Sequence, residues 1–430
     1  MKRALWRLMW IVVIVYGIYY LNEQVKDESE LSKQTLSDEL STLSTAEPIP
    51  PEVQMDSESS LEDDEQQVPS LLVPEDVESN DSLYEQINPE VAEPYVALEK
   101  EIRRAFLDRE ESFTVTFDGD SKKLKDDLGI IIEQAMTWDD YTAYIIESYR
   151  YTVQSFAKNN TITIESKYRE SIEQSAFVSK QADDILAKII KPEMNDHEKV
   201  LAIHDWIVTN ITYDSSLTRY TAYDALTVGT TVCQGYSLIT HRLMNGAGIE
   251  SIITEGEVES GLHSWNMVKL DGHWYHIDTT WDDPVGGTGI SYKYYLVTDE
   301  QLQKDHSWTN PYPVATVSYN QQLQQLTQQL NKADSNQEQG NLYENIRQHV
   351  GLHWFDDEHT VSSVSAIEQR MKAALKSKKE LVQFRYNGDQ ELKQLLQAAA
   401  KKMNTSFSYS ATFEPMIDGQ SQFVNIQLKY

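Results

Sequence analysis

The single cysteine of this 430-residue chain, Cys233, has the position of a reactive thiol. Alone, it can form neither an internal disulfide bond nor a cysteine-rich zinc site. Thr231 can cap a helix that begins here and runs through the pattern TTVCQGYSLITHRLMNGAG. Unpaired backbone N–H groups and the helix dipole stabilise a thiolate in such a first turn. The alternative interpretation is a small, inert, buried side chain.

A predicted hairpin after this helix supplies a base and a carboxylate. Asp271-Gly272 is a two-residue turn between alternating strands, and its register pairs position 270 with position 273. Paired residues share a face, as do residues two apart, so His263 and Asp278 are expected on the same face, diagonally across the ladder. With Cys233 they would supply nucleophile, base and orienting group for attack on an amide carbonyl.

Other histidines fit this chemistry less well. His276 shares the predicted face of Asp278 and is the main rival base, but it sits beside Asp278 on one strand, whereas the proton relay needs a residue between acid and thiol. His273 and His276 face opposite sides of that strand, so they cannot chelate one ion. We therefore expect neither a metal nor a cofactor.

Three further residues are candidates for contacting substrate. Gln234, next to the thiol, and the backbone N–H of Cys233 could bind an oxyanion. Trp265 and Trp281 are interpreted as core or wall residues near the triad, and Trp281, which follows the second strand, could also stack on a substrate.

Three motifs in order, CQGY, HSWN and WYHIDTTWDDP, resemble the bacterial transglutaminase-like superfamily. The resemblance extends from about Asp196 to Trp308. It implies a papain-like α+β fold with a Cys-His-Asp triad carried by Cys233, His263 and Asp278. The superfamily includes protein-crosslinking transglutaminases, cysteine peptidases, amidases and inactive relatives, and the resemblance does not choose among them.

The first 21 residues are expected to form an uncleaved transmembrane anchor. Basic residues precede an uncharged run that ends at Leu21, and counting from Ala4 the stretch reaches the lower limit for a bilayer. Bulky residues end the run, so it lacks the small-residue site of a cleaved signal peptide. The flanking charges predict a single-pass protein of the cell membrane with its C-terminal body on the extracytoplasmic side.

The segment that follows is polar and acidic. Residues 22–90 are rich in Ser, Glu, Asp and Pro and show no sustained apolar period, so we expect a disordered acidic stalk. The whole chain has a formal net charge of −31. This excludes nucleic-acid binding through a general basic surface.

An internal repeat flanks the central motifs. Leu98–Asp120 aligns without gaps with Ile367–Asp389, and each copy predicts a helix, a strand, a second helix and a closing strand. Gly119 and Gly388 are expected at equivalent turns with positive φ. We therefore predict small α+β modules at 91–175 and 341–430, a catalytic domain at 176–318 and a polar linker at 319–340.

These observations favour an exported, membrane-anchored enzyme of cysteine-dependent acyl transfer at amide bonds. The expected partner is a peptide or protein at the cell surface, hydrolysed as by a peptidase or amidase. A protein-crosslinking transglutaminase is the alternative within the enzyme class. A non-catalytic scaffold or binding protein of the cell envelope is the alternative outside it.

Overall fold

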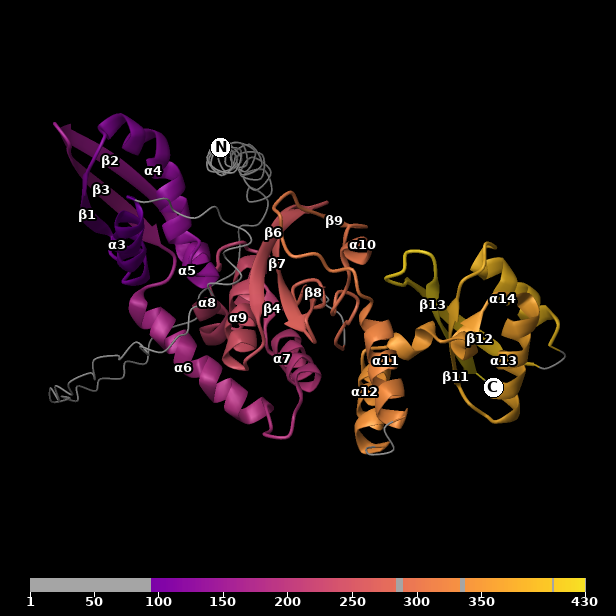
Figure 1. The fold of residues 1–430 in the computed structure, drawn as a ribbon. Coiled ribbons are helices and arrows are strands. Elements are labelled where there is room, and N and C mark those ends of the chain that lie inside the picture. The colour runs from indigo at the N-terminus through magenta and orange to yellow at the C-terminus, as the bar shows by residue number, and fades with distance from the viewer. Residues whose placement is uncertain (1–93, 284–288, 333–336, 404–405, 430) are drawn as a thin grey trace, which may run out of the picture. The chain divides into compact units, whose positions relative to one another are not determined.

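The computed structural model describes residues 94–283, 289–332, 337–403 and 406–429 (Figure 1). The predicted anchor (1–21) and stalk (22–90) lie outside these ranges. Among the described helices, none combines the length and the hydropathy that a bilayer crossing needs. The described residues fall into two compact units, one of residues 94–96 and 122–134 and the other of 97–121 and everything described from 135 onward.

The N-terminal segment is a mixture of helices and a three-stranded antiparallel sheet. Its elements are α3 (Val96–Leu107), β1 (Ser112–Asp118), α4 (Ser121–Met136), α5 (Asp140–Ile145), β2 (Ile146–Phe156) and β3 (Asn159–Tyr168), with strand order β1-β3-β2. Phe113, Val115 and Phe117 of β1 point inward and alternate with exposed residues. This alternation is the period of a strand with one buried face.

The central domain starts with four helices, three of which begin at N-terminal caps that the sequence supplies. They are α6 (Ile172–Ile189), α7 (Asp196–Asn210), α8 (Ala222–Thr227) and α9 (Cys233–Gly246). Ser171, Asn195 and Thr221 each form a capping box that satisfies free N–H groups of α6, α7 and α8.

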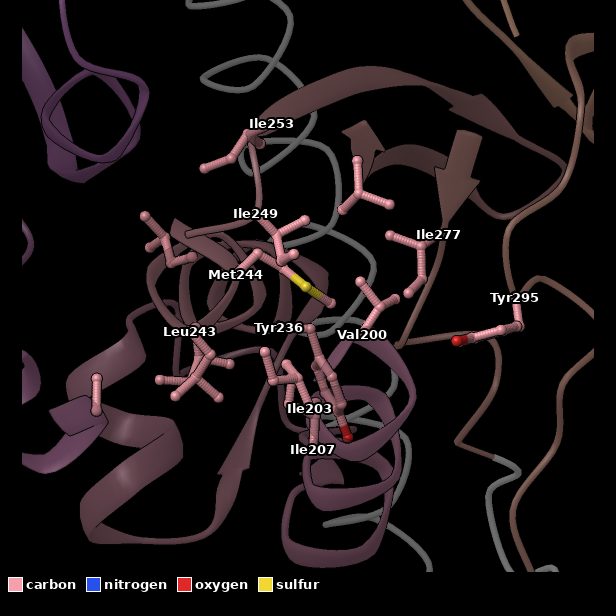
Figure 2. Close-up of a cluster of buried hydrophobic side chains, with 14 of the residues drawn as sticks. Val200, Ile203, Ile207, Tyr236, Leu243, Met244, Ile249, Ile253, Ile277 and Tyr295 are labelled. Carbon is pink, nitrogen blue, oxygen red and sulfur yellow. The ribbon is translucent and has the colours of Figure 1, made fainter. Parts of the chain in front are cut away.

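The core of the central domain is a cluster of buried apolar side chains drawn largely from α7, α9 and the following strands. In Figure 2 the labelled members of this cluster are Val200, Ile203, Ile207, Tyr236, Leu243, Met244, Ile249, Ile253, Ile277 and Tyr295. Because α9 lies within this cluster, its first residue has a fixed position relative to the neighbouring sheet.

That sheet has four antiparallel strands in the order β8-β7-β6-β9. They are β6 (Ser251–Val258), β7 (Gly261–Leu270), β8 (His273–Ile277) and β9 (His306–Ser307). The predicted hairpin register is confirmed, since Leu270 pairs with His273 and the ladder continues to Asn266 opposite Ile277. Asp271 and Gly272 have φ values of 50° and 79°, as a two-residue hairpin turn with both central residues left-handed requires.

Short elements complete the central domain. The two-residue strands β4 (Thr212–Tyr213) and β5 (Thr230–Thr231) pair in parallel just before α9. Helix α10 (Asp299–Leu302) precedes β9.

The segment predicted as a polar linker differs from that expectation. Helices α11 (Tyr319–Lys332) and α12 (Gln337–His349) occupy most of it and continue beyond it. Tyr319, Leu323 and the partly buried Leu326 lie on one face of α11 and pack into the central core. The many glutamines in this segment favoured the linker interpretation. Three apolar residues at helical spacing nevertheless suffice to bury one face of a helix.

The C-terminal segment has the same order of long elements as the N-terminal one. After the short helices η1 (Leu352–Phe355) and η2 (Asp357–His359) come β10 (Thr360–Val361), α13 (Val364–Lys376), β11 (Leu381–Tyr386), α14 (Leu392–Lys401), β12 (Ser408–Pro415) and β13 (Gln422–Lys429). The sheet order is β10-β11-β13-β12, so the last strand lies between the other two long ones, as β3 does in the N-terminal segment. The N-terminal segment contains one strand more than expected, β2, and the C-terminal segment contains two, β10 and β12. That the segments are copies of one unit stays a prediction.

The two equivalent glycines follow a different rule from the expected one. Neither Gly119 nor Gly388 has a positive φ. Instead, a Cβ at Gly119 would lie 2.3 Å from the ring of Phe117, and one at Gly388 would lie 2.4 Å from the hydroxyl of Tyr386. In both turns an aromatic side chain lies against the glycine, so a larger residue there would require that ring to move.

Candidate active site

Cys233 begins helix α9, and the helix start has no side-chain cap. Val232 is the N-cap residue and has no polar side chain to accept from the first N–H groups. The expected cap, Thr231, instead donates its hydroxyl to the carbonyl of Arg219 at 3.2 Å. The first turn of α9 therefore keeps N–H groups that can face a negative charge next to the thiol.

The thiol of Cys233 is hydrogen-bonded to the imidazole of His263 and to the backbone N–H and hydroxyl of Ser264. Burial raises the pKa of the thiol, but the hydrogen bonds and the charge of His263 outweigh it, so the net shift of the Cys233 pKa is downward. A lowered thiol pKa at a helix start favours the thiolate, which is the nucleophilic form.

His263 is held between the thiol and a buried carboxylate. Its Nε2 donates to Oδ2 of Asp278 at 2.7 Å, and Asp278 is 1% exposed. Burial lowers the pKa of His263, but the charge of Asp278 and the hydrogen bonds to Asp278 and Cys233 raise it to about 10. Burial likewise opposes ionisation of Asp278, yet the nearby His263 holds the pKa of that carboxyl well below its usual range. The favoured state is a thiolate beside an imidazolium.

The other oxygen of Asp278 is fixed by the backbone. Its Oδ1 accepts from the N–H groups of Thr280 at 3.0 Å and Trp281 at 3.2 Å. Because both oxygens are engaged, the carboxylate has a fixed orientation and transmits it to the imidazole of His263.

A second histidine, His306, reaches the same carboxylate. Its Nε2 lies 3.2 Å from Oδ2 of Asp278, the oxygen that His263 also contacts. The sequence alone assigns His306 no role, although it lies near the end of the stretch that resembles the transglutaminase-like superfamily. The pairing of β9 with β6 brings it to the site, opposite Val258, and spacing alone gives no sign of that contact.

Within the described residues, His263, Asp278 and His306 are also the group that could approach one metal ion, since their ligand atoms lie within 4.8 Å of one another. Each imidazole Nε2 is, however, within hydrogen-bond distance of the same carboxylate oxygen. An ion would displace both hydrogen bonds, so we interpret the group as a hydrogen-bonded network.

The rival base His276 is engaged elsewhere. Its Nδ1 accepts from the indole N–H of Trp265 at 2.9 Å, and its Nε2 donates to Asp299 at 2.9 Å. Burial, only partly offset by Asp299, lowers the pKa of His276. With one nitrogen accepting and the other donating, His276 is neutral here and braces Trp265.

The three predicted substrate-contact residues lie in different surroundings. The side-chain amide of Gln234 donates to the backbone carbonyl of Tyr144. Trp265 is 1% exposed and stacks on His263 with ring centroids 5.9 Å apart. Trp281 is partly exposed, and its ring centroid lies 5.8 Å from that of His263. Of the three, Trp281 combines nearness to the base with access to solvent.

Comparison with protein families finds one match in the part of the chain that holds this site. Residues 183–279, which include Cys233, His263 and Asp278, match the sequence model of the transglutaminase-like superfamily. The chain contains a transglutaminase-like domain. The match ends just after Asp278, so His306 and Trp281 lie outside it.

Curated relatives of the transglutaminase-like domain are distant. The kyphoscoliosis peptidase of Homo sapiens is 25% identical over 166 residues, which cover 34% of this chain and 25% of that protein. The kyphoscoliosis peptidase of Mus musculus is 27% identical over 127 residues, which cover 25% of this chain and 19% of that protein. The chain thus spans a quarter or less of the length of these relatives.

Three solved structures also match. One is described as a cysteine protease of Cytophaga hutchinsonii, with 17% identity, a TM-score of 0.22, and coverage of 33% of this chain and 68% of that one. A second, a TGase, has 15% identity, a TM-score of 0.22, and coverage of 43% and 55%. A third is described as a protease of Parabacteroides distasonis, with 8% identity, a TM-score of 0.21, and coverage of 66% and 62%.

Proposed function

We propose that the transglutaminase-like domain catalyses cysteine-dependent acyl transfer at amide bonds, as a peptidase or amidase acting on surface or cell-wall peptides. The observation that carries the proposal is the contact chain of three side chains: the Cys233 thiol is hydrogen-bonded to His263, whose Nε2 lies 2.7 Å from Asp278. Nucleophile, base and orienting carboxylate are the parts that this chemistry needs.

In the first half of the proposed reaction, Sγ of Cys233 forms a bond to the amide carbonyl carbon. The electron pair of the C=O bond moves to oxygen, and the resulting oxyanion is stabilised by N–H groups at the start of α9, which no side chain caps. The imidazolium of His263 then gives its proton to the leaving nitrogen. The C–N bond breaks, an amine departs, and a thioester with Cys233 remains.

In the second half, a nucleophile resolves the thioester. His263, now neutral, takes a proton from the attacking water while oxygen bonds to the carbonyl carbon. The C–S bond breaks, the carboxylic acid leaves, and the thiolate–imidazolium pair of Cys233 and His263 is restored. If an amine attacks in place of water, the product is a new amide, which is the crosslinking reaction.

The test is thiol labelling followed by substrate capture. Below neutral pH, the native protein should react with iodoacetamide far faster than free cysteine does, and Cys233→Ala should remove the labelled site. A peptide-like reagent that carries an electrophilic group should then label the native protein. It should label neither Cys233→Ala nor His263→Ala. Labelling at the rate of free cysteine would contradict the proposal and favour a non-catalytic scaffold.

Products distinguish the two outcomes of the second half. The captured acyl donor, incubated with a fluorescent primary amine, should release free acid as its main product. Predominant incorporation of the amine would show a transglutaminase in place of a hydrolase.

We also propose that residues 1–21 anchor the protein in the cell membrane with the catalytic domain outside. The support is the uncharged run to Leu21 behind Lys2, Arg3 and Arg7. Protease treatment of intact cells should release the body of the protein. A soluble mature form that begins near residue 22 would show a cleaved signal peptide instead.

A further inference from the structure

His306 is a buried histidine that the proposed mechanism does not use. It lies on β9 and is 2% exposed. Its Nε2 is 3.2 Å from Oδ2 of Asp278, and its Nδ1 is 2.7 Å from Oδ1 of Asp305. A carboxylate only accepts hydrogen bonds, so His306 is the donor in a hydrogen bond to Asp278 or to Asp305.

Asp305, which contacts Nδ1 of His306, is itself held by two side chains. Oδ2 of Asp305 accepts from the hydroxyl of Tyr294 at 2.6 Å and from the ammonium group of Lys293 at 3.4 Å. Asp305 therefore has a fixed position of its own and can hold the ring of His306 from behind.

Several aromatic rings pack near the imidazole of His306. Ring-centroid distances are 4.5 Å to Trp281, 5.2 Å to Trp265 and 5.4 Å to Tyr294. The ring of His263 lies 5.4 Å away. Among the described residues, the charged or titratable groups near His306 include the following: Asp278, Asp305, His263, His276 and, behind Asp305, Tyr294 and Lys293.

These contacts join five side chains in a row: Cys233, His263, Asp278, His306 and Asp305. We propose that His306 is a positioning residue of the active site. Its hydrogen bond to Asp278 fixes the carboxylate oxygen that holds His263, and through it keeps the imidazole aimed at the thiol. This inference rests on the proposed function, because it assigns a role in forming the thiolate–imidazolium pair.

The role differs from simple core packing in what a replacement must keep. A side chain that only fills space can be replaced by one of similar size, whereas a positioning residue must still donate to Oδ2 of Asp278. The amide nitrogen of Gln can reach the place of the His Nε2 atom, and that of Asn only the place of Nδ1. His306→Gln therefore retains the donor to Asp278, and His306→Asn retains only the donor to Asp305.

The experiment compares these two variants in the full-length protein. Both remove any positive charge at position 306, so the comparison isolates the hydrogen bond from the charge. At pH 6, where a free thiol is protonated, the alkylation rate reports the thiolate–imidazolium pair. We expect iodoacetamide to label Cys233 of His306→Gln at least about tenfold faster than that of His306→Asn, which corresponds to one charge-assisted hydrogen bond.

Two controls accompany the pair. Above pH 10 the thiol ionises without help, so both variants should react alike there if both are folded and accessible. His197 is a matched control residue, since it is 3% exposed and its Nε2 contacts Asp271 at 3.0 Å, at the opposite end of β8 from Asp278. His197→Gln and His197→Asn should label equally at pH 6.

The outcomes separate this inference from the proposed function. Equal rates for the two His306 variants at pH 6, with a native rate well above that of free cysteine, would overturn the positioning role alone. A native rate equal to that of free cysteine would overturn the proposed function. A native rate that changes after dialysis against EDTA would assign His263, Asp278 and His306 to a bound metal and overturn the positioning role.

Discussion

Oδ2 of Asp278 accepts hydrogen bonds from two histidines at once, His263 at 2.7 Å and His306 at 3.2 Å. The shorter bond joins it to the histidine that contacts the thiol. Its other oxygen accepts only backbone N–H groups. The carboxylate is thus the centre of the site, and its loss would release the base rather than remove it.

The first prediction follows from that position. Asp278→Asn should lower amide turnover by roughly 10⁴-fold yet leave a residual rate, because the amide can hold His263 in the wrong tautomer. His263→Ala and Cys233→Ala should leave no thiol-dependent turnover. Steady-state kinetics with the captured acyl donor measures the difference.

Asp271→Asn is the control for this series. Asp271 also contacts a histidine, His197, but at the hairpin turn, away from Cys233. Its replacement should leave turnover within a few-fold of native. An Asp278→Asn enzyme as active as the control would exclude Asp278 from the relay.

The second prediction concerns pH. The pKa of Cys233 is lowered and that of His263 is raised to about 10, so the ion pair should exist between these two values. Alkylation should therefore remain fast below pH 8.5, the usual pKa of a thiol. Amide turnover should fall as pH rises through about 10, because His263 then loses the proton that the leaving amine needs.

The pH–rate profile of iodoacetamide labelling checks this directly. His263→Ala should move the onset of labelling up toward the ordinary thiol range. A native profile with one step near pH 8.5 would show that Cys233 carries no ion pair.

The third prediction concerns the start of α9. A Cβ added at Gly235 would lie 1.9 Å from the hydroxyl of Thr231 and 2.8 Å from the carbonyl of Thr221. Gly235→Ala should therefore displace the first turn that carries the thiol, lower the free energy of unfolding by about 1–3 kcal/mol, and slow alkylation. Gly246→Ala in the same helix meets only a terminal methyl of Leu186. That variant should be close to native in both chemical denaturation and labelling.

The hairpin shows why part of this site could be predicted. The two-residue turn at Asp271-Gly272 fixes the register, and register fixes which side chains share a face. The contact between His263 and Asp278 agrees with that inference, although Asp278 lies one residue beyond the end of β8. No such local rule exists for His306, whose two-residue strand pairs with β6 across a long loop.

The missed elements have equally specific reasons. Strand β2 has the burial pattern of a mostly exposed strand, without the alternation that marks a buried face. Thr231 has the residue type of a helix cap, but its hydroxyl donates instead to the backbone carbonyl of Arg219. For Thr231 the deciding partner lies twelve residues away, where local sequence patterns carry no information.

The fourth prediction tests whether α11 stabilises the transglutaminase-like domain. Leu323 is fully buried in the central core. Leu323→Ala should lower the free energy of unfolding by about 2–5 kcal/mol, measured by chemical denaturation. Gln325→Ala, at an exposed position of the same helix, should change it by less than about 0.5 kcal/mol. If the two variants are equally stable, α11 does not stabilise the domain and the segment is a linker, as predicted from the sequence.

The last prediction concerns the C-terminal limit of the transglutaminase-like domain. A truncation at Asn341, the start of the predicted module, would remove most of α12. Ile346 and Val350 are 3% and 7% exposed and pack into the same core as Tyr236 of α9. Their loss should destabilise the domain by several kcal/mol and abolish labelling of Cys233 at pH 6.

A truncation after Asp357 keeps these contacts. It also keeps Arg347, which is 4% exposed and contacts Asp356 at 2.6 Å, so no buried charge loses its partner. This shorter protein should fold and hydrolyse a small amide at a near-native rate. Melting curves and kinetics of the two truncated proteins test this prediction. Loss of small-substrate turnover in a folded protein ending at Asp357 would mean that the C-terminal segment completes the active site.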